Sequence, residues 1–401
     1  MLEVEPPLLH WYAEERARLC ADVFDVHTHV GQHDPDTMRC SPEELLAALE
    51  QADARAAVFP LQEPGGYRRP NAAVIAAAQA SGGRLVPFAR LDPRDDPAGE
   101  ALRSLDAGAR GLKLHPRGDS HALDDPLLAP VWELAHERHL PVVIHAGRGI
   151  PALGAHAVEI CMRWPGARLV LAHAAISDLA WIGRRARELP NLMFDTSWWA
   201  PSDLLALFAT VPPGQILFAS DAPYGRIPTG ALQTLRIGRQ AGLSDEQLRL
   251  VLGGQLARLL DGEEPLDVGP PPAGERISVD VLLDRVATFL TGAFAQIVRG
   301  QDGDEMLALA RLACAVPADA PQTAHCRLIV ELMDAADRLR DAPTPSRLLR
   351  GGLPQLVLAL NVARTPDVEV PLTLLAARPQ APRPPGAPSP AILEEERPEE
   401  S

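Results

Sequence analysis

ADVFDVHTHV, residues 21–30, is an apolar run that carries His27 and His29 two positions apart near its end. Residues i and i+2 of a strand point the same way, with Cα atoms roughly 6.5 Å apart, so both imidazoles can contact one small object. A metal ion is the obvious candidate, because histidine is the commonest metal ligand. Two hydrogen-bonded core histidines would give the same short pattern, so the rest of the chain has to decide between these interpretations.

This run is the first of eight short apolar segments that alternate with longer helix-like segments between residues 21 and 260. The other seven are AAVFPLQ (56–62), RLVPFARLD (84–92), ARGLKLHP (109–116), PVVIHAG (141–147), ARLVLAHA (167–174), NLMFDTS (191–197) and QILFASDAP (215–223). Eight strand–helix units over this length predict an α/β fold, the (β/α)8 TIM barrel. The rival, a doubly wound open sheet, would need a Gly-rich phosphate turn after its first strand, and GxGxxG is absent there.

Helix start signals lie between the runs. Ser41-Pro42-Glu43-Glu44 predicts an N-cap, a proline at the first helical position and an acidic first turn. Ser244 with Gln247 predicts a capping box.

The chain divides by composition into five segments. We expect an N-terminal helical extension (1–20), the barrel (21–260), a Pro/Gly-rich linker (261–276), an all-helical region (277–364) and a disordered Pro-rich, then acidic tail (365–401). The helical region has apolar stripes but no cluster of His, Asp or Glu with ligand spacing. We therefore expect it to be a packing or dimerisation element outside the active site.

Composition limits the partners and the compartment. The formal net charge of −15, without a basic block, argues against nucleic acid and anionic membranes as partners. We expect no membrane span, because no run of about eighteen apolar residues is uninterrupted, and no signal peptide at the N-terminus. The five cysteines are scattered and never form a CxxC pair, which favours a reducing cytoplasm.

Lys113 is the only lysine in the chain, although Lys and Arg together number 38. A buried lysine can lose its proton and be modified, which a guanidinium cannot do. Chance retention in an Arg-rich composition is the alternative explanation.

Polar residues gather where the predicted strands end, which is where parallel barrels place their catalytic residues. They are His27, His29, Lys113, His115, His145, His173, Asp195, Ser197 and Asp221. Each has an ordinary structural explanation when taken alone: Asp221 can form a turn, and Asp195 and Ser197 can be loop hydrogen-bonders. Together they are costly to bury without a shared partner, so their joint placement predicts a metal site.

The same residues carry a resemblance to a known family. The matching motifs are D-x-H-x-H (25–29), G-x-K-L-H-P (111–116), P-V-x-I-H-x-G (141–147), A-H (172–173) and F-x-S-D-x-P (218–223). With them the chain resembles the amidohydrolase superfamily, specifically its amidohydrolase-2 branch, over about residues 20–260. Ala219 and Gln255 depart from the glycine and asparagine usual in that branch, at positions that are not presumed ligands.

The resemblance implies the cofactor and the roles of the site residues. His27, His29, His145 and Asp221 would hold a divalent metal, usually zinc. His173 would contact the substrate or help to bind a second ion. In binuclear relatives a lysine on the fourth strand reacts with CO₂ and the resulting carbamate bridges the two ions, and Lys113 stands at that position.

The chemistry follows from such a ligand set. Zinc acidifies a bound water and polarises a carbonyl, and Asp221 is placed to accept the water's proton and return it to the leaving group. Candidates for binding the substrate are His115, Arg117, Arg148, Trp198 and Tyr224. For the arginines the alternative is ordinary surface charge, and for the aromatic residues it is packing at the barrel end.

The sequence thus predicts a metal-dependent hydrolase acting on a small amide, ester or lactone. Non-oxidative decarboxylation of a small aromatic or unsaturated acid is the alternative within the branch, and the lysine on the fourth strand argues against it. A non-catalytic barrel scaffold with a helical partner-binding module also remains. We expect a small-molecule substrate and possible homo-oligomerisation through the helical region.

Overall fold

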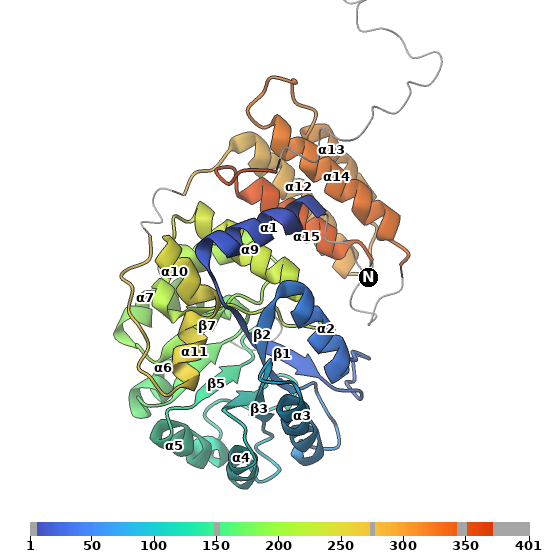
Figure 1. The fold of residues 1–401 in the computed structure, drawn as a ribbon. Coiled ribbons are helices and arrows are strands. Elements are labelled where there is room, and N and C mark those ends of the chain that lie inside the picture. Colours follow the sequence, from blue (N-terminus) through green and yellow to red (C-terminus); the bar gives the residue numbers. More distant parts are fainter. Residues whose placement is uncertain (1–5, 148–152, 273–276, 343–350, 372–401) are drawn as a thin grey trace, which may run out of the picture.

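The computed structural model describes residues 6–147, 153–272, 277–342 and 351–371. Eight parallel strands pair in the order of the chain and form a nearly closed barrel, as the alternation of apolar runs predicts (Figure 1). The strands are β1 (Val23–Val30), β2 (Ala54–Pro60), β3 (Leu85–Arg90), β4 (Gly111–Leu114), β5 (Pro141–Ile144), β6 (Arg168–Leu171), β7 (Leu192–Asp195) and β8 (Ile216–Leu217). Each of the eight predicted runs overlaps one of these strands.

The barrel closes between β1 and the segment that follows the short β8. The Val26 N–H donates to the Phe218 carbonyl at 3.0 Å, and the His29 N–H donates to the Ala222 carbonyl at 2.7 Å. Thr28 forms a parallel bridge with Ala222. This closure brings the residues around Ala222 beside the two histidines of β1.

The barrel interior is a packed core, as is usual for this fold. Its apolar side chains come from seven of the strands, from the segment after β8 and from α11 (Gln255–Leu260): Phe24, Val26, Ala57, Phe59, Phe88, Val143, Val170, Met193, Leu217, Ala219, Leu256 and Leu259. β4 instead contributes Lys113, whose Nζ lies 4.8 Å from the centroid of the Phe59 ring. Its neighbours Leu112 and Leu114 belong to the outer core, under the helices. Strand alternation therefore turns the only lysine inward.

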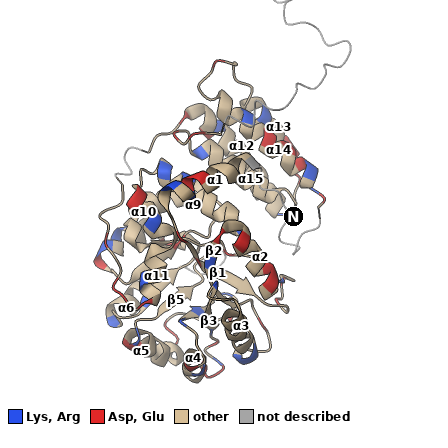
Figure 2. Cartoon of the chain, in the orientation of Figure 1, with Lys and Arg blue, Asp and Glu red and all other residues tan. Residues whose placement is uncertain are grey.

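Helices surround the barrel. Both predicted caps are confirmed: Ser41 forms a capping box with Glu44 at α2 (Pro42–Ala52), and Ser244 forms one with Gln247 at α10 (Asp245–Arg249). The others before the C-terminal region are α1 (Pro6–Leu19), α3 (Arg68–Ala80), α4 (Pro97–Asp106), α5 (Ala129–Glu137), α6 (Gly154–Arg163), α7 (Leu179–Arg185), α8 (Pro201–Thr210), α9 (Ile227–Gln240) and α11 (Gln255–Leu260). Charged residues of both signs are interspersed on these helices (Figure 2).

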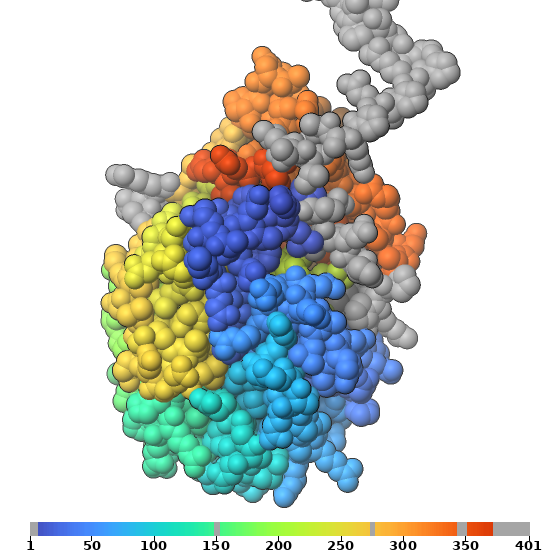
Figure 3. Space-filling model, viewed as in Figure 1, coloured from blue at the N-terminus to red at the C-terminus, as the bar shows by residue number. Residues whose placement is uncertain are grey.

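Four longer helices form the C-terminal region: α12 (Val281–Val298), α13 (Asp304–Ala313), α14 (Thr323–Leu339) and α15 (Leu353–Arg364). They pack on one another, and α15 also packs on α8 and α9 of the barrel. The fully buried guanidinium of Arg236 in α9 donates to the Thr365 hydroxyl at 2.8 Å and to the Val368 carbonyl at 3.2 Å. The region is therefore joined to the barrel, and the two form one continuous body in the space-filling view (Figure 3).

Two expectations change at this end of the chain. Residues 365–371, the start of the predicted disordered tail, are packed against the protein, with Thr365, Val368 and Val370 buried. The remainder of that tail, 372–401, lies outside the described residues. Helix α12 is long and apolar enough, by length and composition alone, to cross a membrane. Its buried side chains, Leu283, Val286, Ala287, Leu290, Ala293 and Phe294, pack within the C-terminal helices.

Candidate metal centre

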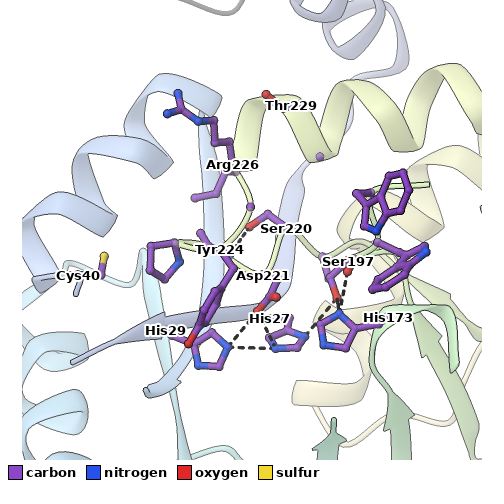
Figure 4. A pocket seen from close by; sticks show the side chains of 18 of the residues that line it. His27, His29, Cys40, His173, Ser197, Ser220, Asp221, Tyr224, Arg226 and Thr229 are labelled. Atoms are coloured by element: carbon purple, nitrogen blue, oxygen red, sulfur yellow. Dashed lines mark hydrogen bonds and ion pairs between the residues drawn. The ribbon is translucent and has the colours of Figure 1, made fainter. Parts of the chain in front are cut away.

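Three ligand atoms converge at the C-terminal end of the barrel (Figure 4). The Nε2 atoms of His27 and His29 lie 3.2 Å apart, and the Asp221 Oδ1 lies 3.3 Å from the first and 3.1 Å from the second. A tetrahedral ion with bonds of about 2.0–2.1 Å separates its ligands by about 3.3–3.4 Å. The triangle therefore has the size that a single ion needs.

The hydrogen bonds of the two rings orient their lone pairs toward this point. The His27 Nδ1 lies 2.8 Å from Asp195 Oδ2, and the His29 Nδ1 lies 3.4 Å from the Pro60 carbonyl oxygen. Because a carboxylate and a carbonyl only accept, each Nδ1 carries the proton and each Nε2 carries a lone pair. Two imidazole lone pairs and a carboxylate oxygen that face one another at these distances are donors that a divalent metal could bind together.

Burial also favours the neutral form of both histidines. It lowers the pKa of His27 and of His29 well below the usual value for histidine, and the nearby Lys113 acts in the same direction. Both imidazoles are thus neutral at physiological pH, which is the form that binds metals. Burial also raises the pKa of the Asp221 carboxyl above its usual range.

Asp195, at the end of β7, organises the site from behind. Its Oδ1 accepts from the His173 N–H (2.8 Å), the Ser197 N–H (2.9 Å) and the Ser197 hydroxyl (2.6 Å), while its Oδ2 accepts from His27. The carboxylate is completely buried. It is therefore more than a local loop hydrogen-bonder, because it sets the tautomer of His27 and anchors the start of the segment that carries His173.

We expect Asp195→Asn to weaken metal binding by about 10- to 100-fold, the range typical of such supporting residues. In either orientation the amide NH₂ faces a donor, since donors approach both carboxylate oxygens of Asp195. Titration against a chromophoric chelator measures the affinity, and Asp106→Asn on the exposed surface is the matched control. Unchanged affinity in a natively folded Asp195→Asn protein would contradict this role.

His145 lies apart from the triangle, next to His173. The His173 Nδ1 donates to the Ser197 carbonyl at 2.8 Å, so its Nε2 accepts from the His145 Nδ1 at 3.0 Å. The His145 Nε2 is then left with a buried lone pair and has no hydrogen-bond partner among the described residues. Its ring stacks on His115 with centroids 4.0 Å apart. The structure thus groups three of the four predicted ligands, and for His145 the role of ligand stays a prediction.

Gly147 explains how His145 and His173 come so close. A Cβ at this position would lie 2.7 Å from the His173 Cδ2 and 3.2 Å from the His145 Cε1. The glycine that ends the P-V-x-I-H-x-G run is therefore required by the approach of two rings.

Two site residues have a strained backbone. His173 and Asp221 lie in the left-handed region, with φ of 57° and 58°. Such conformations are uncommon for residues other than glycine, cost of order 1–3 kcal/mol, and cluster at functional sites. Asp221 is held there by the turn around it, in which the Gly225 N–H donates to the Asp221 carbonyl and the Ala222 N–H to the Ser220 hydroxyl.

Lys113 reaches the same centre from inside the barrel. Its side chain is fully buried, and its Nζ lies 3.3 Å from the His27 Nε2. Burial lowers the pKa of the Lys113 ammonium far below the usual value for lysine, and the attraction of Asp221 opposes this only in part. A free amine is therefore accessible to Lys113 near neutral pH.

Arg90 is a residue of this rim that the sequence analysis missed. It ends β3, is buried, and binds Asp119 through Nε and Nη2 at 3.1 and 3.0 Å. Tyr67 donates its hydroxyl to the same carboxylate at 2.5 Å and places its ring 4.8 Å from the guanidinium. The sequence pattern could have identified Arg90, because it follows the apolar residues of a predicted strand just as the histidines chosen in the sequence analysis do.

The centre opens into a cavity of about 1410 Å³. Four of the predicted substrate-binding residues, His115, Arg117, Trp198 and Tyr224, line it, whereas Arg148 lies outside the described residues.

Side chains from the C-terminal helices also line the cavity, among them Phe294 and Val298 of α12 and Leu353 and Val357 of α15. The expectation that this region stands apart from the active site is therefore wrong. Helical periodicity shows which face of a helix is buried, but not what covers that face.

A family model described as amidohydrolase matches residues 10–261. No curated protein matches the chain in sequence.

Solved structures with a similar fold each match 60% of the chain. An uncharacterized TIM-barrel protein from Bordetella bronchiseptica is 16% identical, with 99% of its own chain covered and a TM-score of 0.48. A 5-carboxyvanillate decarboxylase from Sphingomonas paucimobilis is 16% identical (99% covered, TM-score 0.46). A 2,6-dihydroxybenzoate decarboxylase from Rhizobium is 13% identical (98% covered, TM-score 0.47).

Proposed function

The chain belongs to the amidohydrolase family, and from this premise we propose that it is a metal-dependent hydrolase that cleaves a small amide, ester or lactone. The observation that carries the proposal is the triangle of His27 Nε2, His29 Nε2 and Asp221 Oδ1, with sides of 3.1–3.3 Å. We propose zinc as the ion, because two imidazole nitrogens and one carboxylate oxygen are a donor set that zinc favours.

His27, His29 and Asp221 would hold this ion, with His145 as the fourth candidate because its buried Nε2 lone pair has no partner among the described residues. The bound ion would act as a Lewis acid toward a water and a substrate carbonyl. The protein's part is to keep the ligands neutral and oriented, through Asp195 on His27 and the Pro60 carbonyl on His29.

Asp221 is the proposed general base. Within the described residues, its contacts with His27 and His29 both use Oδ1, which leaves Oδ2 for a proton. We propose that Asp221 takes the proton of the attacking water and returns it to the leaving nitrogen or oxygen.

Two aromatic residues would orient the substrate. Trp198 lies edge-on to His173 at 6.1 Å, and its indole N–H donates to Asp203 at 2.6 Å, which fixes the ring plane. Tyr224 lies edge-on to His29 at 5.8 Å. They would form flat walls on two sides of the reacting carbonyl, and the Arg117 guanidinium is a candidate partner for a carboxylate on the substrate.

The test measures metal content and hydrolytic turnover on the same protein preparation. We expect protein purified without chelator to carry one to two equivalents of a divalent metal, and to hydrolyse at least one member of a panel of amides, esters and lactones. Chelation should stop the reaction and zinc should restore it. His29→Ala should lose the metal, because it removes one corner of the triangle. His33→Ala is the matched control, since that side chain is exposed and lies outside the triangle.

Elemental analysis and product identification decide the outcome. Metal below a tenth of an equivalent, with none taken up on reconstitution, would contradict the metal centre. A metal-loaded protein that releases CO₂ from aromatic or unsaturated acids and hydrolyses nothing in the panel would contradict the hydrolase and identify a decarboxylase.

A further inference from the structure

The C-terminal helices lie beyond the part of the chain that matches the family, yet they border the cavity above the metal centre. Their lining residues are Phe294, Ala295, Val298 and Arg299 of α12, Leu339 of α14, the following Ala342, and Leu353, Pro354 and Val357 of α15. Except for Arg299 these side chains are apolar. The cavity thus has a polar end, built by the barrel, and an apolar wall supplied by a region that a bare barrel lacks.

A continuous series of aromatic rings joins these two ends. His173 contacts Trp198 with centroids 6.1 Å apart, Trp198 contacts Trp199 at 6.0 Å, and Trp199 stacks on Phe294 of α12 at 3.9 Å and 17°. The Gln233 side chain holds the two tryptophans in place by donating to the Trp198 carbonyl at 3.0 Å and to the Trp199 carbonyl at 3.4 Å. The path from the centre to α12 is therefore built from fixed apolar surface.

The size and polarity of this space indicate what would fill it. A volume of about 1410 Å³ exceeds the range of roughly 300–1,000 Å³ that is typical of small-molecule sites. An acetyl-sized group at the metal centre would leave the wall of α12 and α15 in contact with water only. Along the wall of α12 and α15 a polar extension of the substrate would lose its hydrogen bonds with water and meet few partners, although polar side chains such as Arg39, Glu44 and Arg226 line the cavity elsewhere.

We propose that α12 and α15 form the distal half of the substrate site, and that the substrate carries an elongated alkyl group on one side of the bond that is cleaved. This inference rests on the proposed hydrolase function and names its substrate class. The alkyl chain would run along Trp198 and Trp199 to Phe294 and Val298, while the amide or ester remains at the metal centre.

Esters of p-nitrophenol with acyl chains from acetyl to decanoyl test the proposal in the metal-loaded, full-length protein. We expect kcat/KM to rise with chain length by up to about fourfold per methylene, the factor that corresponds to about 0.8 kcal/mol for each buried CH₂. The decisive variant is Val298→Asn, which places an amide in the apolar wall at a partly exposed position where the fold tolerates it. It should lower the ratio of decanoyl to acetyl kcat/KM by about tenfold or more.

Val281→Asn is the matched control, because Val281 belongs to the same helix, is 77% exposed and does not line the cavity. It should keep the wild-type ratio. A wild-type ratio near one, or equal ratios in the two variants, would overturn the proposal.

Binding separates this inference from the hydrolase function. Decanamide and acetamide are titrated calorimetrically into the wild-type protein and both variants. Tighter binding of decanamide that is weakened by Val298→Asn but not by Val281→Asn supports the distal site, even if no ester or amide is cleaved. Equal binding of the two amides overturns it, even if short esters are hydrolysed.

Discussion

Asp221→Asn is expected to lower kcat/KM by about 10²–10⁴-fold while the protein retains most of its metal. The amide keeps an oxygen that can point at His27 and His29, where the Asp221 Oδ1 now lies at 3.3 and 3.1 Å. It cannot accept a proton at neutral pH, and general base catalysis typically contributes that factor.

Kinetics on a substrate from the panel, together with elemental analysis of the same preparation, measure the two effects separately. Asp261→Asn, an exposed carboxylate after α11, is the control for loss of negative charge. A decrease of less than about tenfold would show that Asp221 is not the base. Loss of metal in proportion to activity would show that it acts only as a ligand.

The second large effect is expected at Lys113. If the free amine attacks CO₂, an N–C bond forms, one proton is released, and the resulting carbamate offers two anionic oxygens close to His27. Arginine cannot form a carbamate, because its guanidinium stays protonated. Lys113→Arg should then lower the metal content by half or more and eliminate activity, since it also forces a larger charged group into a fully buried position.

Two measurements distinguish the carbamate from an unmodified amine. Protein equilibrated with ¹³C-labelled bicarbonate should show a carbamate signal by NMR that is absent from Lys113→Met, a neutral variant of similar length. Activity of Lys113→Ala should be partly restored by formate or acetate, which would supply the missing oxygens. A Lys113→Arg protein that keeps one ion and part of its activity would show instead that the side chain binds substrate as a cation.

Local features of the site were predictable from the sequence because they depend on neighbours along the chain. Period-two alternation put His27 and His29 on one face of β1 and turned Lys113 into the barrel between Leu112 and Leu114. Apolar runs and turn signals located all eight strands, and Ser41 with Glu44 predicted the start of α2. These patterns reflect backbone geometry and burial, which act over a few residues.

Contacts between distant segments were decided by the tertiary structure. Asp195 and His27 are 168 positions apart, and only the order of strands around the barrel shows that one sets the tautomer of the other. The same applies to Arg90, whose charge is offset by Asp119 from a different loop.

Sequence determined by itself that this chain forms a parallel barrel with imidazoles, a carboxylate and one lysine at a single rim. Tertiary structure alone decided that barrel closure completes the triangle with Asp221, that His145 pairs with His173, and that Phe294 of α12 lines the cavity and stacks on Trp199. The physical reason is that apolar faces of strands and helices specify burial without specifying a partner. Their pairing depends on the shape and closure of the whole fold.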